Sequence, residues 1–494
     1  MPLPVALYST AQVRELDAHA IQFMGVTGYT LMKRAGEAAL RYLRTRWPMA
    51  HRIVIVCGAG NNGGDGYVLA RFAQAAGLAV TVLSASPPEQ LRGDARTAYT
   101  DFIASGASVR PFDAALLSLG DVIVDALLGT GLVGAVRAGL ISVIRAINQS
   151  GKPVFALDVP SGLDGDAGTV PGEEAVRAEA TVTFVGLKTG LFVGDGPEFS
   201  GTVFCDDLEV SPPPSAQPVP RLTRIVEAEI HEALPRRPRS SNKGDFGRVL
   251  IVGGGPGMPG AARLAGEACL RAGAGLTTVA VVPENVVAIA GGRPELICVG
   301  FNDVAGLREA MGRADVIAVG PGLGRSSWAS AALAAVLDSG KPLVVDADAL
   351  NLMAEQGTVP AREDWILTPH PGEAGRLLGL SAQQIQQDRL SALDRLVERF
   401  HGTVVLKGAG TLVGARGRTP GVCERGNPGM ATAGTGDVLT GAIAGILAQC
   451  HDPWAAARVG VLVHAMAGDA AARAGERGVL ASDLTRELHV CVNL

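Results

Sequence analysis

The sequence predicts an α/β protein of two domains, each built on a mainly parallel sheet. Short apolar runs that end in Gly or Asp alternate with helical stretches along the whole chain, an order typical of a parallel sheet covered by helices. The length of 494 residues exceeds that of one ordinary domain. A Pro-rich linker at 211–225, with five prolines between 212 and 220, divides the chain into domains 1–210 and 226–494.

Composition and charge exclude several classes of protein. A net charge of −5 gives no electrostatic basis for binding nucleic acid. No uncharged apolar segment reaches the length of a membrane span, and the first residues lack the basic region of a signal peptide. The seven cysteines are scattered, without a C-x-x-C motif, which predicts reduced thiols and a cytoplasmic location. We therefore expect small-molecule partners.

The strands of both domains are predicted from their apolar runs. In the first domain a helix is expected near 11–24, further helices at 66–76 and 140–149, and strands within 52–58, 78–85, 121–129, 153–166 and 180–188. In the second domain strands are expected within 248–254, 276–282, 315–322, 342–348 and 403–410, and helices at 261–272 and 328–338. Ligands of open α/β sheets lie beyond the carboxyl ends of the strands, where the small and acidic residues of both domains collect.

A Gly-rich segment, 58–66, follows the first strand. Its spacing imitates the G-x-G-x-x-G dinucleotide fingerprint, but the next strand ends in Ser84 and Ser86, without the acidic residue that binds a ribose. Two Asn and an Asp also crowd this loop, and their oxygens suit a hard cation or a hydrogen-bonded ligand. Asp125 and the loop 158–161 are expected to converge on the same place. An ordinary turn is the alternative.

A second Gly-rich segment, 427–437, precedes an apolar helix expected to begin near Gly436 or Asp437. Free N–H groups at a helix start form an anion site, where the Asp437 carboxylate would be repelled by a phosphate. A general base facing a substrate hydroxyl explains the aspartate, and an N-cap is the alternative.

Other motifs of the second domain also lie at predicted strand ends. They are GGGPGMPG (253–260), GPGLG (320–324), TPHPGE (368–373) and KGAGT (407–411). The Lys407 ammonium and the N–H groups after it are candidates to hold a phosphate. His370 lies in a loop fixed by two prolines and is a candidate site residue. Asp346 and Asp348 end a strand, where an N-cap is the alternative.

Four segments of the first domain together resemble the NAD(P)H-hydrate epimerase domain, a Rossmann-like three-layer fold. They are GAGNNGGDG, DALLGTGLVG (125–134), ALDVPSGLDGDAG (156–168) and TVTFVGLKTGL (181–191). The resemblance implies a potassium ion at Asn62, Asp125 and Ser161, and acid–base catalysis by Asp158. Lys188 is a further candidate for proton transfer or phosphate contact, unless it is merely solvated. The implied substrate-binding residues are Asn61, Asn62, Gly63, Gly64, Asp65, Gly129, Thr130, Gly131, Leu132, Val133, Gly134, Ala135 and Asp158.

The second domain resembles the ADP-dependent NAD(P)H-hydrate dehydratase, which has a ribokinase-like fold. The segments NKGDFGRVLIVGG, VVDADALN, TPHPGE, KGAGT and NPGMATAGTGDVLTG carry this resemblance. It implies that ADP binds at Lys407, Gly408, Ala409, Gly410, Thr411 and Gly436, and the hydrated nucleotide at Gly257, Gly322, His370 and Asp437. Asp437 would deprotonate the C6 hydroxyl, whose oxygen attacks the terminal phosphate of ADP. A magnesium ion is expected at the phosphates.

Together the two resemblances imply repair of hydrated NADH and NADPH: epimerisation of the R and S forms, then dehydration of the S form to NAD(P)H with release of AMP and phosphate. One alternative is a ribokinase-fold kinase for a vitamin alcohol, against which the NNGGDG segment argues. Another is a non-catalytic nucleotide-binding sensor, against which the intact Asp158 and Asp437 argue. A homo-oligomer is compatible with either resemblance.

Overall fold

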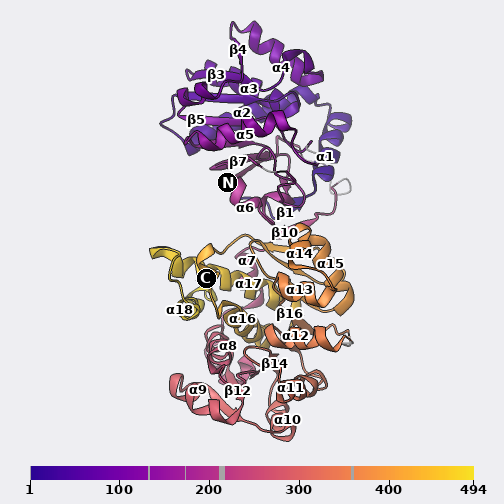
Figure 1. Ribbon diagram of the computed structural model, residues 1–494, viewed down its shortest axis with the longest axis vertical. Coiled ribbons are helices and arrows are strands. Elements are labelled where there is room, and N and C mark those ends of the chain that lie inside the picture. The colour runs from indigo at the N-terminus through magenta and orange to yellow at the C-terminus, as the bar shows by residue number, and fades with distance from the viewer. Residues whose placement is uncertain (1, 132–133, 173, 211–216, 358–360) are drawn as a thin grey trace. The chain divides into compact units, whose positions relative to one another are not determined.

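The structure is a computed structural model that describes residues 2–131, 134–172, 174–210, 217–357 and 361–494 (Figure 1). The chain forms two compact units, unit 1 (Met1–Thr223) and unit 2 (Arg224–Leu494).

Unit 1 is built on a parallel sheet. Within its described residues the strand order is β4-β3-β2-β5-β6-β7-β9, and every pairing is parallel. The strands are β2 (Arg52–Cys57), β3 (Ala79–Ser84), β4 (Val109–Pro111), β5 (Val122–Ala126), β6 (Val154–Leu157), β7 (Ala180–Phe184) and β9 (Thr202–Asp206). The short strands β1 (Ala6–Tyr8), β8 (Leu187–Lys188) and β10 (Leu222–Arg224) lie outside this seven-stranded order. Strand β1 pairs antiparallel with β10 and parallel with β8.

Helices cover both faces of this sheet. They are α1 (Thr10–Phe23), α2 (Gly28–Arg46), α3 (Asn61–Ala75), α4 (Gly93–Ala104), α5 (Ala138–Gln149) and the short α6 (Gly196–Ser200). Alternate residues of β2 enter different cores: Ile53 and Ile55 pack with α2, α3 and α4, whereas Val54 and Val56 pack with α5. Side chains of a strand alternate between faces, so this two-sided burial gives three layers. The predicted Rossmann-like, three-layer α/β class is confirmed.

Unit 2 is a second α/β unit. Its described strands run in the order β13-β12-β11-β14-β15-β16-β17-β18-β19, parallel up to β17 and antiparallel beyond it. They are β11 (Arg248–Val252), β12 (Leu276–Val281), β13 (Ile297–Gly300), β14 (Val316–Val319), β15 (Leu343–Val345), β16 (Trp365–Leu367), β17 (Thr403–Leu406), β18 (Thr411–Gly414) and β19 (Gly421–Cys423).

The main core of unit 2 lies between one face of its sheet and the helices α8 (Pro259–Arg271), α16 (Thr435–Cys450), α17 (Pro453–Ala471) and α18 (Ala481–Cys491). The remaining helices are α7 (Ala228–Ala233), α9 (Val286–Gly292), α10 (Val304–Gly312), α11 (Ser327–Leu337), α12 (Ala347–Gln356), α13 (Pro371–Leu378), α14 (Ala382–Gln387) and α15 (Arg389–Phe400). Figure 1 shows α11, α12 and α13 on the side of the sheet away from α8.

Several sequence predictions need correction. The strand expected at 180–188 is broken into β7 and β8 because Val185 has a φ of 66°, a left-handed conformation that ends a strand. Residues 222–224, placed in the linker, form β10, and 211–216 lie outside the described residues. The sequence prediction also missed α2. The domain limits themselves stay a prediction.

Candidate active sites

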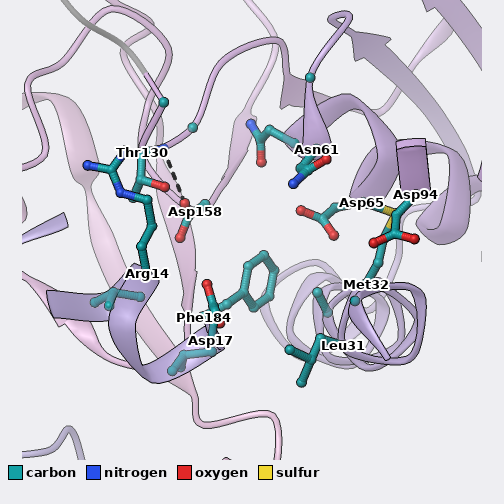
Figure 2. Close-up of a pocket in the computed structure, with 18 of the residues that line it drawn as sticks. Arg14, Asp17, Leu31, Met32, Asn61, Asp65, Asp94, Thr130, Asp158 and Phe184 are labelled. Carbon is teal, nitrogen blue, oxygen red and sulfur yellow. Dashed lines mark hydrogen bonds between the residues drawn. The ribbon is translucent and has the colours of Figure 1, made fainter. Parts of the chain in front are cut away.

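A cavity of about 460 Å³ lies beyond the carboxyl ends of the central strands of unit 1 (Figure 2). The chain winds outward from β2 to β4 and returns at β5, so the strand order reverses between β2 and β5. Ligands of open α/β sheets bind at such a switch point. The cavity is lined by Val13, Arg14, Asp17, Ile21, Asn61, Asn62, Asp65, Gly129, Thr130, Gly131, Asp158, Phe184 and Lys188, among others.

The first wall of this cavity is the start of α3. Asn61–Asp65, expected in a loop, form the first turn of this helix. A Cβ atom at Gly63 would lie 2.1 Å from the Gly58 carbonyl oxygen, and one at Gly66 would lie 2.7 Å from the Ala126 Cβ. The glycines therefore let α3 pack against the ends of β2 and β5. The segment differs from an ordinary turn because its Asn and Asp side chains are fixed on a helix start.

The second wall carries an ion pair. The Lys188 Nζ donates to the Asp158 Oδ1 at 2.5 Å and to the Phe184 carbonyl at 2.7 Å. Lys188 is 1% exposed, so it is not a solvated surface lysine. Asp158 has a φ of 65°, a strained conformation for a residue other than glycine, and its Oδ2 accepts the Thr130 N–H at 3.4 Å. The fold thus holds the Asp158 carboxylate in one orientation at the cavity.

A buried polar group lies beside the cavity. Asp125 is fully buried and accepts hydrogen bonds from the Ser161 hydroxyl (2.6 Å) and the Ser161 N–H (2.8 Å). Burial raises the pKa of Asp125 to about 6, although these bonds oppose the shift. The Asn62 Nδ2 donates to the Leu128 carbonyl at 2.7 Å, while the buried Asn62 Oδ1 has no partner among the described residues. The structure therefore brings Asn62, Asp125 and Ser161 together.

Two further carboxyl groups face the same cavity. Burial raises the pKa of Asp65 well above its usual value, and nearby Asp158 and Asp17 act in the same direction. Burial also raises the pKa of Asp17 to about 6, opposed by Lys188 and reinforced by Asp158. Neither carboxyl has a hydrogen bond or ion pair within the described chain. Sequence reasoning missed Asp17, which carries no motif of its own.

The remaining predicted residues of unit 1 divide into three groups. Gly129, Thr130 and Gly131 line the cavity, as Asn61 does. Gly63, Gly64, Gly134 and Ala135 do not line it; at Gly64 a Cβ atom would lie 2.6 Å from the Met32 Cε, so this glycine serves packing. Leu132 and Val133 lie outside the described residues.

In unit 2 the start of α16 forms the candidate site. The helix begins at Thr435, after Gly434 as N-cap, which has a φ of 91°. Asp437 is the third residue of the helix, so the alternative that it is the N-cap is wrong. Burial, and next the nearby Asp346, raise the pKa of Asp437 to about 7, while Lys407 opposes the shift. The His464 Nε2, on α17, donates to the Thr435 carbonyl at 2.9 Å and holds the first turn of α16 in place.

Lys407 is held beside this helix start by Asp346. The Lys407 Nζ donates to the Asp346 Oδ1 at 2.6 Å, and the Thr440 hydroxyl donates to the Asp346 Oδ2, also at 2.6 Å. Asp346 precedes α12 but makes no capping hydrogen bond, so its carboxylate orients Lys407 instead. The sequence prediction left this role of Asp346 unrecognised because its partners lie 61 and 94 positions away.

His370 and Glu373 complete this cluster. The His370 Nδ1 accepts the Gly372 N–H at 2.9 Å, and Glu373 accepts the His370 N–H at 2.8 Å, so the pair caps α13. With Nδ1 as acceptor, the neutral imidazole carries its proton on Nε2. Burial lowers the pKa of His370 and raises that of Glu373 to about 7. The Glu373 Oε2 lies 3.8 Å from the Lys407 Nζ.

The glycines of unit 2 mark where its loops approach one another. A Cβ atom at Gly436 would lie 3.5 Å from the Lys407 Nζ, so the helix start and this ammonium are adjacent. A Cβ at Gly322 would lie 2.9 Å from the Met258 carbonyl oxygen. The loops that follow β11 and β14 are therefore in close contact. Gly257 faces open space. Gly408, Ala409 and Gly410 form the turn before Thr411, whose hydroxyl donates to the Gly408 carbonyl at 2.9 Å.

Among the described residues, no three His, Cys, Asp or Glu side chains are grouped so that they could hold a metal ion by themselves. No helix in the described ranges is both long and apolar enough to span a membrane.

An acid–base cavity at the switch point of one α/β unit, followed by a lysine and a buried aspartate at a helix start in a second, defines an α/β enzyme with two sites. Two family models match the chain: "YjeF-related protein N-terminus" over residues 28–190, and "NAD(P)H-hydrate dehydratase" over residues 249–489. The chain belongs to the family of bifunctional NAD(P)H-hydrate repair enzymes.

Full-length relatives support this assignment. The chain is 48% identical over 489 residues to the bifunctional NAD(P)H-hydrate repair enzyme Nnr of Coxiella burnetii, covering 99% of both chains. It is 42% identical to Nnr of Escherichia coli, covering 99% of this chain and 95% of that one.

Solved structures resemble the part that carries the second site. A ribokinase-like superfamily protein from Enterococcus faecalis is 34% identical with a TM-score of 0.51, covering 54% of this chain and 94% of its own. The ADP/ATP-dependent NAD(P)H-hydrate dehydratase of Bacillus subtilis, co-crystallised with ATP and Mg²⁺, is 30% identical with a TM-score of 0.50, covering 54% and 96%. The predicted ribokinase-like fold is confirmed.

Proposed function

We propose that unit 1 epimerises the R and S forms of hydrated NADH and NADPH, and that unit 2 dehydrates the S form with ADP, giving NAD(P)H, AMP and phosphate. The observation that carries this proposal is the presence, in one chain, of two candidate sites whose aspartates lie in different environments. Asp158 is charge-paired with Lys188 at a cavity, and Asp437 lies at a helix start beside Lys407. One pair suits proton transfer on a bound ring, and the other suits proton removal next to a phosphate.

The geometry of unit 1 supports the epimerase assignment. Inversion at C6 needs a group that removes a proton and a cavity that keeps the ring in place. Asp158 reaches the cavity with its orientation fixed by Lys188 and Thr130. The substrate contacts proposed here are the predicted residues that line the cavity: Asn61, Asn62, Asp65, Gly129, Thr130, Gly131 and Asp158.

A potassium ion fits the buried polar cluster of Asn62, Asp125 and Ser161 beside this cavity. Asp125 is buried without a cationic side chain among the groups that shift its pKa, and the Asn62 Oδ1 is buried without a donor. A hard cation held by Asn62, Asp125 and Ser161 would satisfy both oxygens, since such ions prefer carboxylate, amide and hydroxyl ligands. When bound it would supply positive charge next to the substrate-binding start of α3.

In unit 2 we assign the general base to Asp437. Asp437 takes the proton from the C6 hydroxyl, so that the C6 oxygen attacks the terminal phosphorus of ADP and AMP leaves. Loss of phosphate from C6 and of a proton from C5 then restores the reduced nicotinamide. The N–H groups of the first turn of α16 and the Lys407 ammonium stabilise the transferring phosphoryl charge. Asp346 and Thr440 hold Lys407 and α16 in register for this step.

The remaining contacts of unit 2 follow from this assignment. We place the nucleotide at Lys407–Thr411 and Gly436, and the hydrated ring at Gly257, Gly322 and His370, whose Nε2 proton is available as a donor. Asp346, Glu373 and Asp437 surround one ammonium, which leaves excess negative charge. A magnesium ion that arrives with the nucleotide phosphates fits this charge, since magnesium is commonly bound by one or two carboxylates plus phosphates. The cytoplasm is part of the proposal, because all seven cysteines are free thiols.

The test replaces each of the two aspartates by asparagine, in separate variants of the full-length chain. Asp437→Asn is expected to abolish dehydration of the S hydrate while the R and S forms still equilibrate. Asp158→Asn is expected to do the converse. Chiral chromatography of the hydrates and the near-ultraviolet absorbance of the reduced nicotinamide measure the two reactions separately. Dehydration that survives Asp437→Asn would remove this residue as the base, and loss of both activities in either variant would contradict the division of labour.

A further inference from the structure

Helix α1 contributes an acidic side chain to the cavity of unit 1, and this helix lies before the segment matched by the first family model, 28–190. The helix is fixed at its start: Ser9 and Gln12 form a reciprocal cap, and Asp166 accepts the Thr10 N–H at 2.6 Å and the Thr10 hydroxyl at 2.9 Å. Its position is therefore coupled to the loop that follows Asp158.

The buried stripe of α1 directs Asp17 inward. Val13 and Ala20 are buried. Asp17 lies four positions after Val13 and three before Ala20, so it is on the same face of the helix. Figure 2 shows the Asp17 carboxyl beside Phe184, below Asp158, with Asp65 across the cavity. No hydrogen bond or ion pair engages Asp17 within the described residues. A partly buried carboxyl without a partner is costly unless a ligand or a proton satisfies it.

Charge in the cavity divides the carboxyl groups into two kinds. Lys188 pairs directly with Asp158, whereas Asp17 and Asp65 share no such cation. Arg14, on α1, also lines the cavity but is exposed, and Asp94 adds a further negative group. Titratable groups whose environments separate them in this way serve as an acid and a base.

We propose that Asp17 is the second proton-transfer residue of the epimerase reaction, acting together with Asp158. This inference rests on the proposed function of unit 1. In one direction Asp17 gives its proton to the C6 hydroxyl, the C–O bond breaks, water leaves, and the lone pair of the ring nitrogen N1 forms the C=N bond. Water then adds to the other face of C6 and loses a proton to Asp158, which restores the N1 lone pair. The reverse reaction uses the same groups with exchanged roles, so no oxidant or reductant is needed.

Asp17 suits this role better than Asp65. The pKa of about 6 lets Asp17 exchange its proton near neutral pH, which is the condition for efficient acid–base catalysis. Burial, and next the nearby Asp158 and Asp17, raise the pKa of Asp65 well above its usual value. Asp65 also belongs to the first turn of α3, close to the proposed cation ligands, whereas Asp17 is on a separate helix.

The experiment compares Asp17→Asn with Glu15→Gln in the full-length enzyme. Glu15 lies on the same helix, is exposed and does not line the cavity, so it is the matched control. Asp17→Asn keeps the size and hydrogen-bonding capacity but cannot transfer a proton. We expect kcat for epimerisation to fall by about 10²-fold or more with KM nearly unchanged, the usual size of a lost general acid. Glu15→Gln is expected to match the unmodified enzyme, and dehydration of pure S hydrate is expected to be unaffected in both variants.

Further measurements separate proton transfer from a structural role. Asp17→Glu, which retains a carboxyl, is expected to recover part of kcat. In the direction in which Asp17 acts as the acid, the alkaline limb of the kcat profile is expected to be lost in Asp17→Asn. An unchanged kcat, a rise in KM alone, or equal losses in Asp17→Asn and Asp17→Glu would each overturn the inference. If the unmodified enzyme does not equilibrate the R and S hydrates, the proposed function fails before the variants are compared.

Discussion

At the scale of single residues, the two sites differ in how the protein holds the aspartate: orientation is controlled at Asp158 and the pKa at Asp437. Asp158 is oriented by a buried lysine, a main-chain N–H and a strained backbone. Asp437 instead owes its raised pKa mainly to burial. The sequence predicted both because each follows a Gly-rich or strand-end motif. It could not predict that Asp17 and Asp346 join them, since those contacts depend on helix orientation and on partners far along the chain.

The pKa of Asp437 leads to a prediction about pH. As a base Asp437 acts only when ionised, so kcat/KM for dehydration should rise with pH through about 7 and then level. Well below that midpoint it should fall about tenfold per pH unit, because the ionised fraction does. The measurement is the pH dependence of kcat/KM on pure S hydrate. A rate that is flat between about pH 6 and 8 would exclude Asp437 as the titrating base.

The same shift sets the sign of a stability effect. A carboxyl whose pKa is raised in the folded state binds its proton more tightly there than in the unfolded chain. Its contribution to the free energy of unfolding is therefore greatest at low pH and is lost as pH rises from the ordinary value of 3.8 through about 7. Above pH 7, Asp437→Asn should unfold no more easily than the unmodified enzyme. This control separates loss of the base from loss of the fold.

The unpartnered Asn62 oxygen leads to a prediction about potassium. Asn62→Ala should weaken the potassium dependence of epimerisation and the potassium-induced rise in the melting temperature, because it removes one proposed ligand. Asn61→Ala is the control: this side chain lines the cavity but is not a proposed cation ligand, so it should change KM and leave the potassium response alone. Equal potassium responses in Asn62→Ala and the unmodified enzyme would remove Asn62 from the cation site.

At the scale of elements, the sequence predicted strands better than the helices that shape the sites. The apolar runs of β2, β5 and β11 are local signals, and they were found within a few residues. The first turn of α3 was mistaken for a loop because its glycines and asparagines are ordinary turn residues, and only the close approach of α3 to β2 explains them. The break at Val185 is likewise a tertiary effect, since a valine seldom adopts a positive φ.

Close packing at the start of α3 gives a prediction for this element. Gly63→Ala would place a methyl group 2.1 Å from the Gly58 carbonyl oxygen, so backbone must move. We expect unit 1 to lose about 1–3 kcal/mol of unfolding free energy, the usual cost of overpacking, together with epimerase activity. Gly139→Ala, in the first turn of α5 with nothing within 4 Å of its added Cβ, is the matched control. Denaturant unfolding measures both, and equal stability of the two variants would contradict this packing.

At the scale of the whole molecule, two compact units each carry their own hydrophobic core and their own candidate site. The sequence allowed this division to be expected from the Pro-rich segment and from motifs that fall in two separate sets. The fusion has a chemical reason under the proposed function: a dehydratase that accepts only the S hydrate leaves the R form behind, and an epimerase on the same chain supplies it.

The most direct test of this account is the recovery of reduced nicotinamide from a mixture of R and S NADH hydrates, incubated with the full-length enzyme, ADP, magnesium and potassium. Near-ultraviolet absorbance follows the recovery. The account predicts that all of the hydrate returns to NADH, with stoichiometric release of AMP and phosphate. Recovery of only the S share would contradict the epimerase role of unit 1. No recovery, with a stable phosphorylated product formed from another alcohol instead, would contradict the repair function altogether.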